Sequence, residues 1–173
     1  MEFSLERGTE LLRRAPGTYR SLLDGLPDEW ISARETAEAW SPWQVLAHVT
    51  WIDEHDWIDR TRVILEHGTE RPFDPVDREA GFDRFSGRTT GELLDRFAEV
   101  RAANLQTLDT LVTPEDLGRP GIHPEFGPVT LDQLLATWVV HDLNHLGQVV
   151  KTMSKEYADA VGPWRRFLPI VDL

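Results

Sequence analysis

The sequence predicts an all-α protein, a four-helix bundle with long connections. Four segments, at 4–23, 41–67, 89–111 and 130–154, carry apolar residues at the three- and four-residue spacing of amphipathic helices. Three of them begin with Ser or Thr and have Gln or Glu three residues later, the pattern of a capping box. Sustained alternation of apolar and polar residues, which would indicate strands, is not found. We therefore expect a single helical domain over residues 1–173.

The first helix is expected from about Ser4 to Leu23. Its apolar face is carried by residues such as Leu12 and Tyr19. The pair Pro16-Gly17 falls in the middle, where it is expected to kink the helix or divide it in two, because proline removes a backbone donor and clashes with the preceding turn.

The second helix has the clearest start. Ser41 is the expected N-cap, Pro42 fits the first helical position and Gln44 completes the capping box. The apolar positions then continue without interruption to His67-Gly68, so one long helix is predicted. The connection that follows, 69–88, is rich in proline but also contains phenylalanines, which favours a structured loop such as a lid.

The third and fourth helices make up most of the remaining chain. The third begins at Thr89 or Thr90 and ends near Leu111, and a connection rich in glycine and proline covers 118–129. The fourth begins with Thr130 as its cap and ends near Ser154. The remaining tail is expected to fold back on the bundle.

Charge and composition exclude several classes of partner. The chain has 30 acidic and 18 basic residues, a formal charge of −12, which repels nucleic-acid phosphates and anionic lipids. Neither a membrane span nor a secretory signal is recognisable, so a cytoplasmic protein is expected. Because the chain contains no cysteine, any bound metal must be held by nitrogen and oxygen ligands.

His141 and His145 are the strongest indication of a functional site. Residues four apart lie on the same face of a helix, so these two imidazoles point the same way, as two ligands of one metal would. The alternative is a pair of ordinary histidines on a partly buried helix. His48, between apolar neighbours in the second helix, is the best candidate for a third ligand; by itself it would be interpreted as a core histidine bonded to a carbonyl.

The other histidines fit simpler interpretations. His55 is flanked by acidic residues, which favours the surface, and His67 lies at a helix C-terminus, where the helix dipole stabilises it. His123, in a proline-rich loop, is at most a pocket-lining residue. Asp142, directly after the first histidine of the pair, is expected on the helix surface or as an acceptor for a ligand histidine.

Three further residues are candidates for the wall of a pocket beside the histidines. Trp51 and Trp138 are large flat side chains on the second and fourth helices, and Gln148 projects from the same face as the histidine pair. The alternative for Gln148 is exposure to solvent.

The residues around these histidines resemble the DinB-like superfamily of small metal-binding four-helix proteins. The matching stretches are 43–49 (WQVLAHV), 141–148 (HDLNHLGQ) and 161–164 (VGPW), in the family's order and over nearly the whole chain. The resemblance implies a divalent metal, zinc or nickel, on His48, His141 and His145. It also implies a homodimer, and an enzyme that acts on a small molecule with a low-molecular-weight thiol. Many members have Arg after the second histidine of the pair; here it is Leu146, so that substrate contact is not carried over.

Three functions remain open from the sequence. The first is a metal-dependent transferase or hydrolase, because three histidine ligands leave coordination positions free for a water or a substrate. The second is a non-catalytic protein that binds a metal or a small ligand in the same pocket. The third is a structural helical dimer with buried, metal-free histidines.

Overall fold

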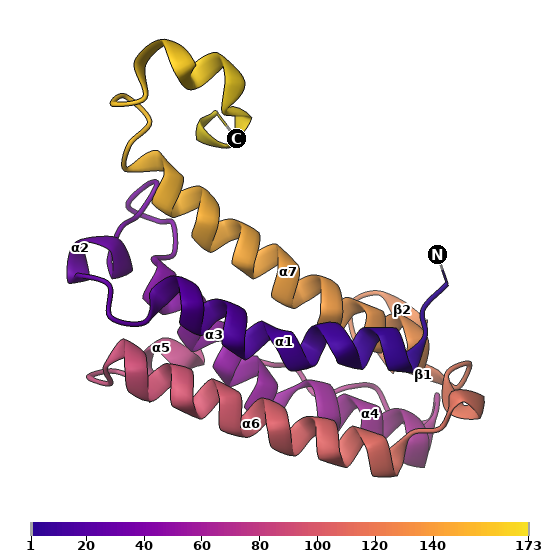
Figure 1. Ribbon diagram of the computed structural model, residues 1–173. Coiled ribbons are helices and arrows are strands. Elements are labelled where there is room, and N and C mark those ends of the chain that lie inside the picture. The colour runs from indigo at the N-terminus through magenta and orange to yellow at the C-terminus, as the bar shows by residue number, and fades with distance from the viewer. Residues whose placement is uncertain (1, 173) are drawn as a thin grey trace.

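The computed structural model describes residues 2–172 and confirms the all-α bundle (Figure 1). Its long helices are α1 (Leu5–Leu23), α3 (Pro42–His55), α4 (Trp57–His67), α6 (Thr90–Leu111) and α7 (Leu131–Lys155). Helices α3 and α4 follow each other along one edge of the bundle, so that together they act as its second helix. Within residues 2–172, no helix is both long and apolar enough to cross a membrane.

Local capping signals account for where the helices begin. In α3, the backbone N–H of Gln44 donates to Ser41 Oγ, and the backbone N–H of Ser41 donates to Gln44 Oε1. Thr89 and Glu92 form the same reciprocal pair at the start of α6. Each pair satisfies backbone donors that a helix leaves unbonded in its first turn. The starts of α1, α3, α6 and α7 therefore lie within about one residue of the predicted positions.

The prediction of one uninterrupted second helix was wrong. The chain breaks at Asp56, whose φ of −124° and ψ of −66° lie outside helical geometry, and α4 starts anew at Trp57. In α1, by contrast, Pro16 is accommodated within a continuous helix, and the helix is not divided. The apolar pattern continues across both places, so periodicity alone does not distinguish them.

The connections contain several short elements. The short turn η1 (Pro114–Asp116) follows α6, where the sequence from Thr113 to Asp116 predicts an extra turn, but the short helices α2 (Asp28–Ile31) and α5 (Ala80–Arg84) in the first two connections were not predicted. Strands β1 (Pro120–His123) and β2 (Gly127–Thr130) pair antiparallel, where only turns were expected. Strands of four residues are too short to show a period, and this hairpin is supported from outside by a hydrogen bond from Phe73 N–H to the carbonyl of Ile122, 3.0 Å long.

The C-terminal tail does not fold back along the bundle as expected. It contains two short turns, η2 (Gly162–Phe167) and η3 (Pro169–Val171), which lie beyond the end of the bundle in Figure 1. Its contact with α7 is at the very end of that helix, where Lys155 Nζ donates to the carbonyl of Val171. Trp164 and Phe167 remain about two-thirds exposed.

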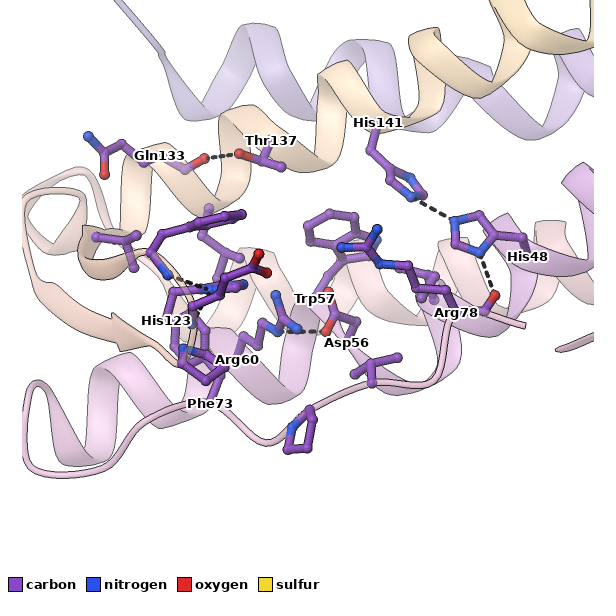
Figure 2. Close-up of a pocket in the computed structure, with 18 of the residues that line it drawn as sticks. His48, Asp56, Trp57, Arg60, Phe73, Arg78, His123, Gln133, Thr137 and His141 are labelled. Carbon is purple, nitrogen blue, oxygen red and sulfur yellow. Dashed lines mark hydrogen bonds and ion pairs between the residues drawn. The ribbon is translucent and has the colours of Figure 1, made fainter. Parts of the chain in front are cut away.

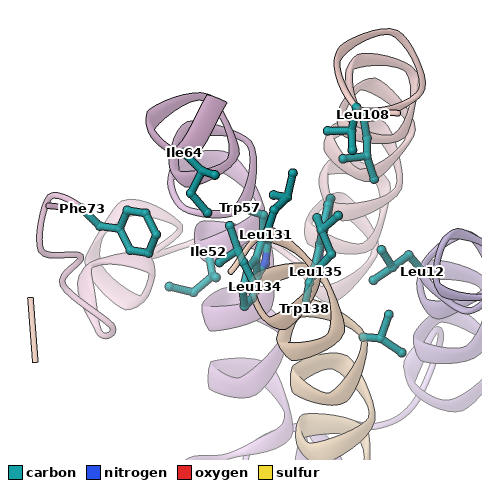
Figure 3. Close-up of a cluster of buried hydrophobic side chains, with 12 residues drawn as sticks. Leu12, Ile52, Trp57, Ile64, Phe73, Leu108, Leu131, Leu134, Leu135 and Trp138 are labelled. Atoms are coloured by element: carbon teal, nitrogen blue, oxygen red, sulfur yellow. The ribbon is translucent and has the colours of Figure 1, made fainter. Parts of the chain in front are cut away.

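Two apolar clusters make up the core. Figure 3 shows one of them, where the side chains of Trp57 and Trp138 stack with ring centroids 5.7 Å apart, between leucines of α1, α6 and α7. The other cluster gathers around Tyr19 and Phe97 at the opposite end of the bundle. Burial of these large side chains is the main stabilising contribution to the fold.

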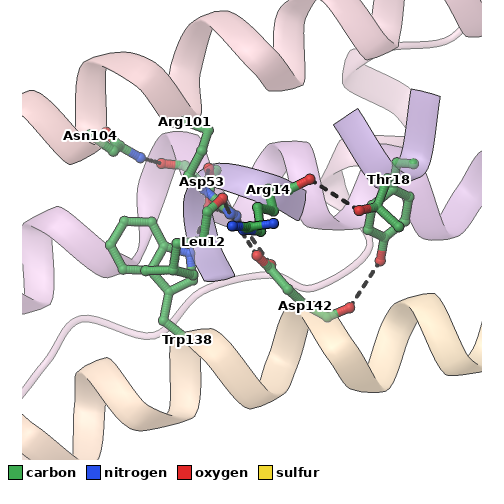
Figure 4. Close-up of polar contacts among 9 residues, drawn as sticks. Leu12, Arg14, Thr18, Asp53, Arg101, Asn104, Trp138 and Asp142 are labelled. Atoms are coloured by element: carbon green, nitrogen blue, oxygen red, sulfur yellow. Dashed lines mark hydrogen bonds and ion pairs between the residues drawn. The ribbon is translucent and has the colours of Figure 1, made fainter. Parts of the chain in front are cut away.

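An ionic network is buried inside the bundle (Figure 4). Arg101 of α6, 1% exposed, bonds Asp53 of α3 at 2.7 and 2.9 Å and Asp142 of α7 at 2.6 and 3.1 Å. Trp138 Nε1 donates to Asp53, and Tyr19 Oη donates to the backbone carbonyl of Asp142. Desolvation raises the pKa of Asp53 to about 6 and also raises the pKa of Asp142, while Arg101 opposes both shifts. The network thus joins α1, α3, α6 and α7.

Candidate metal centre

Helices α3 and α7 bring the three predicted ligand histidines together. His48 comes from α3, and His141 and His145 lie one turn apart on the facing side of α7 (Figure 2 labels the first two). One ligand nitrogen from each histidine can be chosen so that all lie within 4.8 Å of one another. His48 Nε2 and His141 Nε2 are 3.1 Å apart, close to the about 3.3 Å expected between two nitrogens of a tetrahedral zinc site.

Two of the histidines are oriented by bonds from their other ring nitrogen. His48 Nδ1 lies 2.8 Å from the backbone carbonyl of Arg78, and His145 Nδ1 lies 2.9 Å from Gln148 Oε1. Both partners are acceptors, so each Nδ1 carries the proton and each Nε2 presents its lone pair toward the triad. Bonds of this kind commonly fix the orientation of metal-binding histidines. His141 Nδ1 is buried and has no hydrogen-bond partner within residues 2–172.

The electrostatics favour neutral imidazoles at this place. Desolvation lowers the pKa of His48 to about 4, and it also lowers the pKa values of His141 and His145. Neutral imidazole is the form that binds a metal. Nitrogen lone pairs that face one another in a buried space repel unless a proton or a cation lies between them, so the donor set fits a divalent ion.

Gln148 is expected to support metal affinity without contacting the ion. Gln148→Leu removes the acceptor for His145 Nδ1. Metal affinity should therefore fall about 10- to 100-fold. Competition with a chromophoric chelator measures the change. Gln148→Glu keeps an acceptor at the same position and is the matched control; equal loss in both variants would contradict the role assigned to the hydrogen bond.

A cavity of about 490 Å³ opens beside the triad, and all three histidines line it. Its walls include aromatic side chains from four different segments, namely Trp40, Trp57, Phe73 and Phe126. Trp40 also stacks on His145, with the rings 15° from parallel. The volume lies in the range of pockets that enclose small organic molecules.

The aromatic wall is not the one that the sequence suggested. Trp138 is fully buried in the core and bonds Asp53, and Trp51 lies over His55 and donates to the carbonyl of Asp77. Neither is among the lining residues of the 490 Å³ cavity. Trp138 is instead packed behind Trp57, which lines the cavity, and Trp51 is directed toward the 69–88 connection, where Asp77 lies. Gln148 contacts the site through His145 alone.

Of the predictions for the remaining histidines and for Asp142, some are confirmed and one is wrong. His55 and His67 are exposed, in keeping with their surface interpretations, and His123 lines the cavity from β1. Asp142 is neither on the surface nor an acceptor for a histidine, since it is 5% exposed and its carboxylate pairs with Arg101.

Several cavity residues were missed entirely. Trp40 lies in an irregular segment, Arg78 in the predicted lid, and Asp56 with Arg60 at the helix break. Asp56 is 5% exposed, and desolvation raises its pKa to about 6. The acidic residue inside an apolar run was the one available signal, and the sequence does not distinguish it from its acidic neighbours Glu54, which is partly buried, and Asp59, which is exposed.

Comparison with known proteins identifies the family and the fold. Residues 11–149 match the family model described as the DinB superfamily. Among solved structures, YfiT from Bacillus subtilis, described as a probable metal-dependent hydrolase with an unusual four-helix bundle topology, is similar. The TM-score is 0.76 at 19% sequence identity, and the match covers 90% of each chain. No curated protein matches the sequence. At this identity, the structural likeness establishes the fold.

Proposed function

Since this chain belongs to the DinB superfamily, we propose that it is a metal-dependent enzyme that transfers an activated nucleophile to a small molecule bound in the cavity. The observation that carries the proposal is that His48, His141 and His145 converge at the wall of this cavity. Three histidine ligands leave coordination positions free, as in catalytic rather than structural zinc sites. A divalent ion, zinc or nickel, would lower the pKa of a water or thiol and polarise the substrate.

The protein's own residues prepare the cavity for this chemistry. Trp40 covers the triad from one side and Trp57 contacts His141 edge-on, with ring centroids 5.2 Å apart. Such walls exclude water and strengthen electrostatic interactions with the substrate. Asp56, buried at the cavity wall with a pKa raised to about 6, is a group that can hold a proton close to neutral pH.

Hydrolysis is our first candidate reaction, and transfer of a low-molecular-weight thiol is the second. Hydrolysis needs only water, and a similar fold is described as a probable metal-dependent hydrolase. The thiol reaction is favoured by the size of the cavity, which has room for a second organic molecule beside the substrate. Because the chain has no cysteine, such a thiol must be a cosubstrate.

Turnover that depends on metal would test the proposal. Zinc- or nickel-loaded protein is expected to hydrolyse 4-nitrophenyl acetate faster than buffer with the same free metal, and a chelator should remove the difference. A parallel assay with a low-molecular-weight thiol and an activated alkyl or aryl halide tests transfer. Metal binding with no turnover in either assay would contradict the enzyme proposal and favour a non-catalytic binding protein.

We also propose that the protein forms a homodimer. Helices α1 and α7 pack against each other, and their outer surfaces expose Leu11, Val140 and Leu143 by 47%, 62% and 51%. Val140 and Leu143 are three residues apart and share one face of α7, and exposed apolar side chains on a shared face are typical of an interface. Sedimentation should show a dimer for the native protein and a monomer for the Val140→Glu/Leu143→Glu variant. A monomer in both cases, at micromolar concentration, would contradict this proposal.

A further inference from the structure

Arg60 and His123 lie at the end of the cavity away from the metal-binding histidines (Figure 2). We refer to these two residues as the distal subsite. They come from α4 and β1, which are far apart in the sequence and meet only in the fold. We propose that the distal subsite binds an anionic group, such as a carboxylate, at one end of a substrate whose reacting bond lies at the His48, His141 and His145 end. This deepens the proposed function and rests on it.

Arg60 is held in place, and its donors are available. Its side chain is 17% exposed, its Cζ lies 5.2 Å from the centre of the Phe73 ring, and Nε lies 2.6 Å from Asp56 Oδ1. That ion pair is not a well-aligned hydrogen bond, and neither Asp56 Oδ1 nor Arg60 Nε has another partner within residues 2–172. Asp56 therefore acts as a positioning residue, while the guanidinium, which presents five N–H donors, keeps donors for a ligand.

His123 supplies a second donor of known orientation. Its Nδ1 accepts hydrogen bonds from the backbone N–H groups of Glu125 and Phe126, 3.1 and 3.3 Å long. The pKa of His123 is lowered, first by desolvation and then by the charge of Arg60, so the ring is neutral and its proton is on Nε2. The ring is further fixed between Phe126, which stacks on it, and Phe73, which meets it edge-on.

The charges that line the cavity favour an anion. Arg60 lies at the distal end, and Arg78 lines the cavity nearer to His48 (Figure 2). Besides desolvation, the charges of both arginines lower the pKa of His123, while Glu125 raises it. Of the two acidic lining residues, Asp56 is paired with Arg60, and Glu125 is exposed. A cationic guanidinium beside a neutral N–H donor, between aromatic rings, is suited to a planar carboxylate attached to an apolar body.

Binding of benzenesulfonate, compared with that of neutral methyl phenyl sulfone, tests the proposal on the full-length protein with its metal. A sulfonate is an anion with weak affinity for metals, so its binding reports on the subsite. Quenching of tryptophan fluorescence measures both affinities, because Trp40 and Trp57 line the cavity. We expect the sulfonate to bind at least about tenfold more tightly than the sulfone. Equal affinities would overturn the proposal.

Variants test whether the preference for the sulfonate over the sulfone depends on Arg60. Arg60→Gln should reduce sulfonate affinity to that of the sulfone and leave sulfone affinity unchanged. The matched control is Arg62→Gln, an exposed arginine on the same helix outside the cavity, which should keep the preference. Arg60→Gln leaves the buried carboxylate of Asp56 without its partner, which can impair folding. The double variant Asp56→Asn/Arg60→Gln removes both charges and therefore controls for this effect. A preference retained in this folded double variant would overturn the proposal. These readouts need no turnover, so failure of the proposed reaction is distinguishable from failure of the subsite.

Discussion

His141→Ala protein is expected to lose its metal and its metal-dependent activity together. The substitution removes one of three nitrogen donors, and metal affinity should fall by more than the about 10- to 100-fold that follows loss of a mere supporting hydrogen bond. His48→Ala and His145→Ala should have the same effect. Elemental analysis of protein purified without a histidine tag measures the metal content, with about one zinc or nickel per chain expected in the native protein.

His55→Ala is the matched control for these variants. His55 lies on α3, as His48 does, but it is exposed and outside the cavity, so metal content and activity should remain at the native level. Circular dichroism establishes that each variant keeps its helices. Full metal occupancy in all three triad variants would show that the ion binds elsewhere, and absence of metal from the native protein even with excess zinc or nickel would leave a metal-free bundle.

Arg101→Met is expected to destabilise the protein more than any of the other single substitutions. It leaves Asp53 and Asp142 as buried carboxylates without their counter-charge, and breaking a buried ionic pair in this way costs about 3–5 kcal/mol in the free energy of unfolding. Urea-induced unfolding, followed by circular dichroism, measures the change. Arg14→Met, which removes an exposed ion pair with Glu10 on α1, is the control and should stay close to the native stability.

The loss of stability in Arg101→Met should depend on pH with a definite sign. Burial already raises the pKa of Asp53 to about 6 in the native fold, and loss of Arg101 raises it further. A carboxyl whose pKa is higher folded than unfolded favours the fold below its unfolded pKa and loses that contribution as pH rises through the folded pKa. The difference between variant and native protein should therefore be larger at pH 8 than at pH 5. A difference independent of pH would contradict this account.

Asp53→Asn/Arg101→Met/Asp142→Asn separates charge from packing in this network. All three charges are gone, so no unpaired ion remains buried, and most of the stability lost in Arg101→Met should return. If the triple variant is as unstable as Arg101→Met, the contribution of Arg101 is its packing between Phe97 and Trp138, whose rings lie 4.9 and 5.1 Å from its guanidinium.

The sequence by itself determined the features that depend only on residues close together in the chain, such as where helices start and which residues share a helix face. Ser41 with Gln44 and Thr89 with Glu92 cap the helices that they were expected to cap, because these bonds close over three residues. The four-residue spacing of His141 and His145 places them on one face of α7, and the apolar context of His48 indicated that it is buried. The bundle and the pairing of His141 with His145 therefore follow from local patterns in the amino-acid sequence, whereas the addition of His48 to this pair depended on the resemblance to the DinB-like superfamily.

Only the tertiary structure decided which side chains face the cavity and how buried charges are paired. The break at Asp56, the β1–β2 hairpin and the neighbours of Arg60 depend on contacts between segments far apart in the chain, and local patterns carry no information about such contacts. Asp142 shows this most clearly. Its position next to His141 suggested a role at the metal, but successive helical residues point about 100° apart, and its carboxylate is directed to Arg101 on another helix.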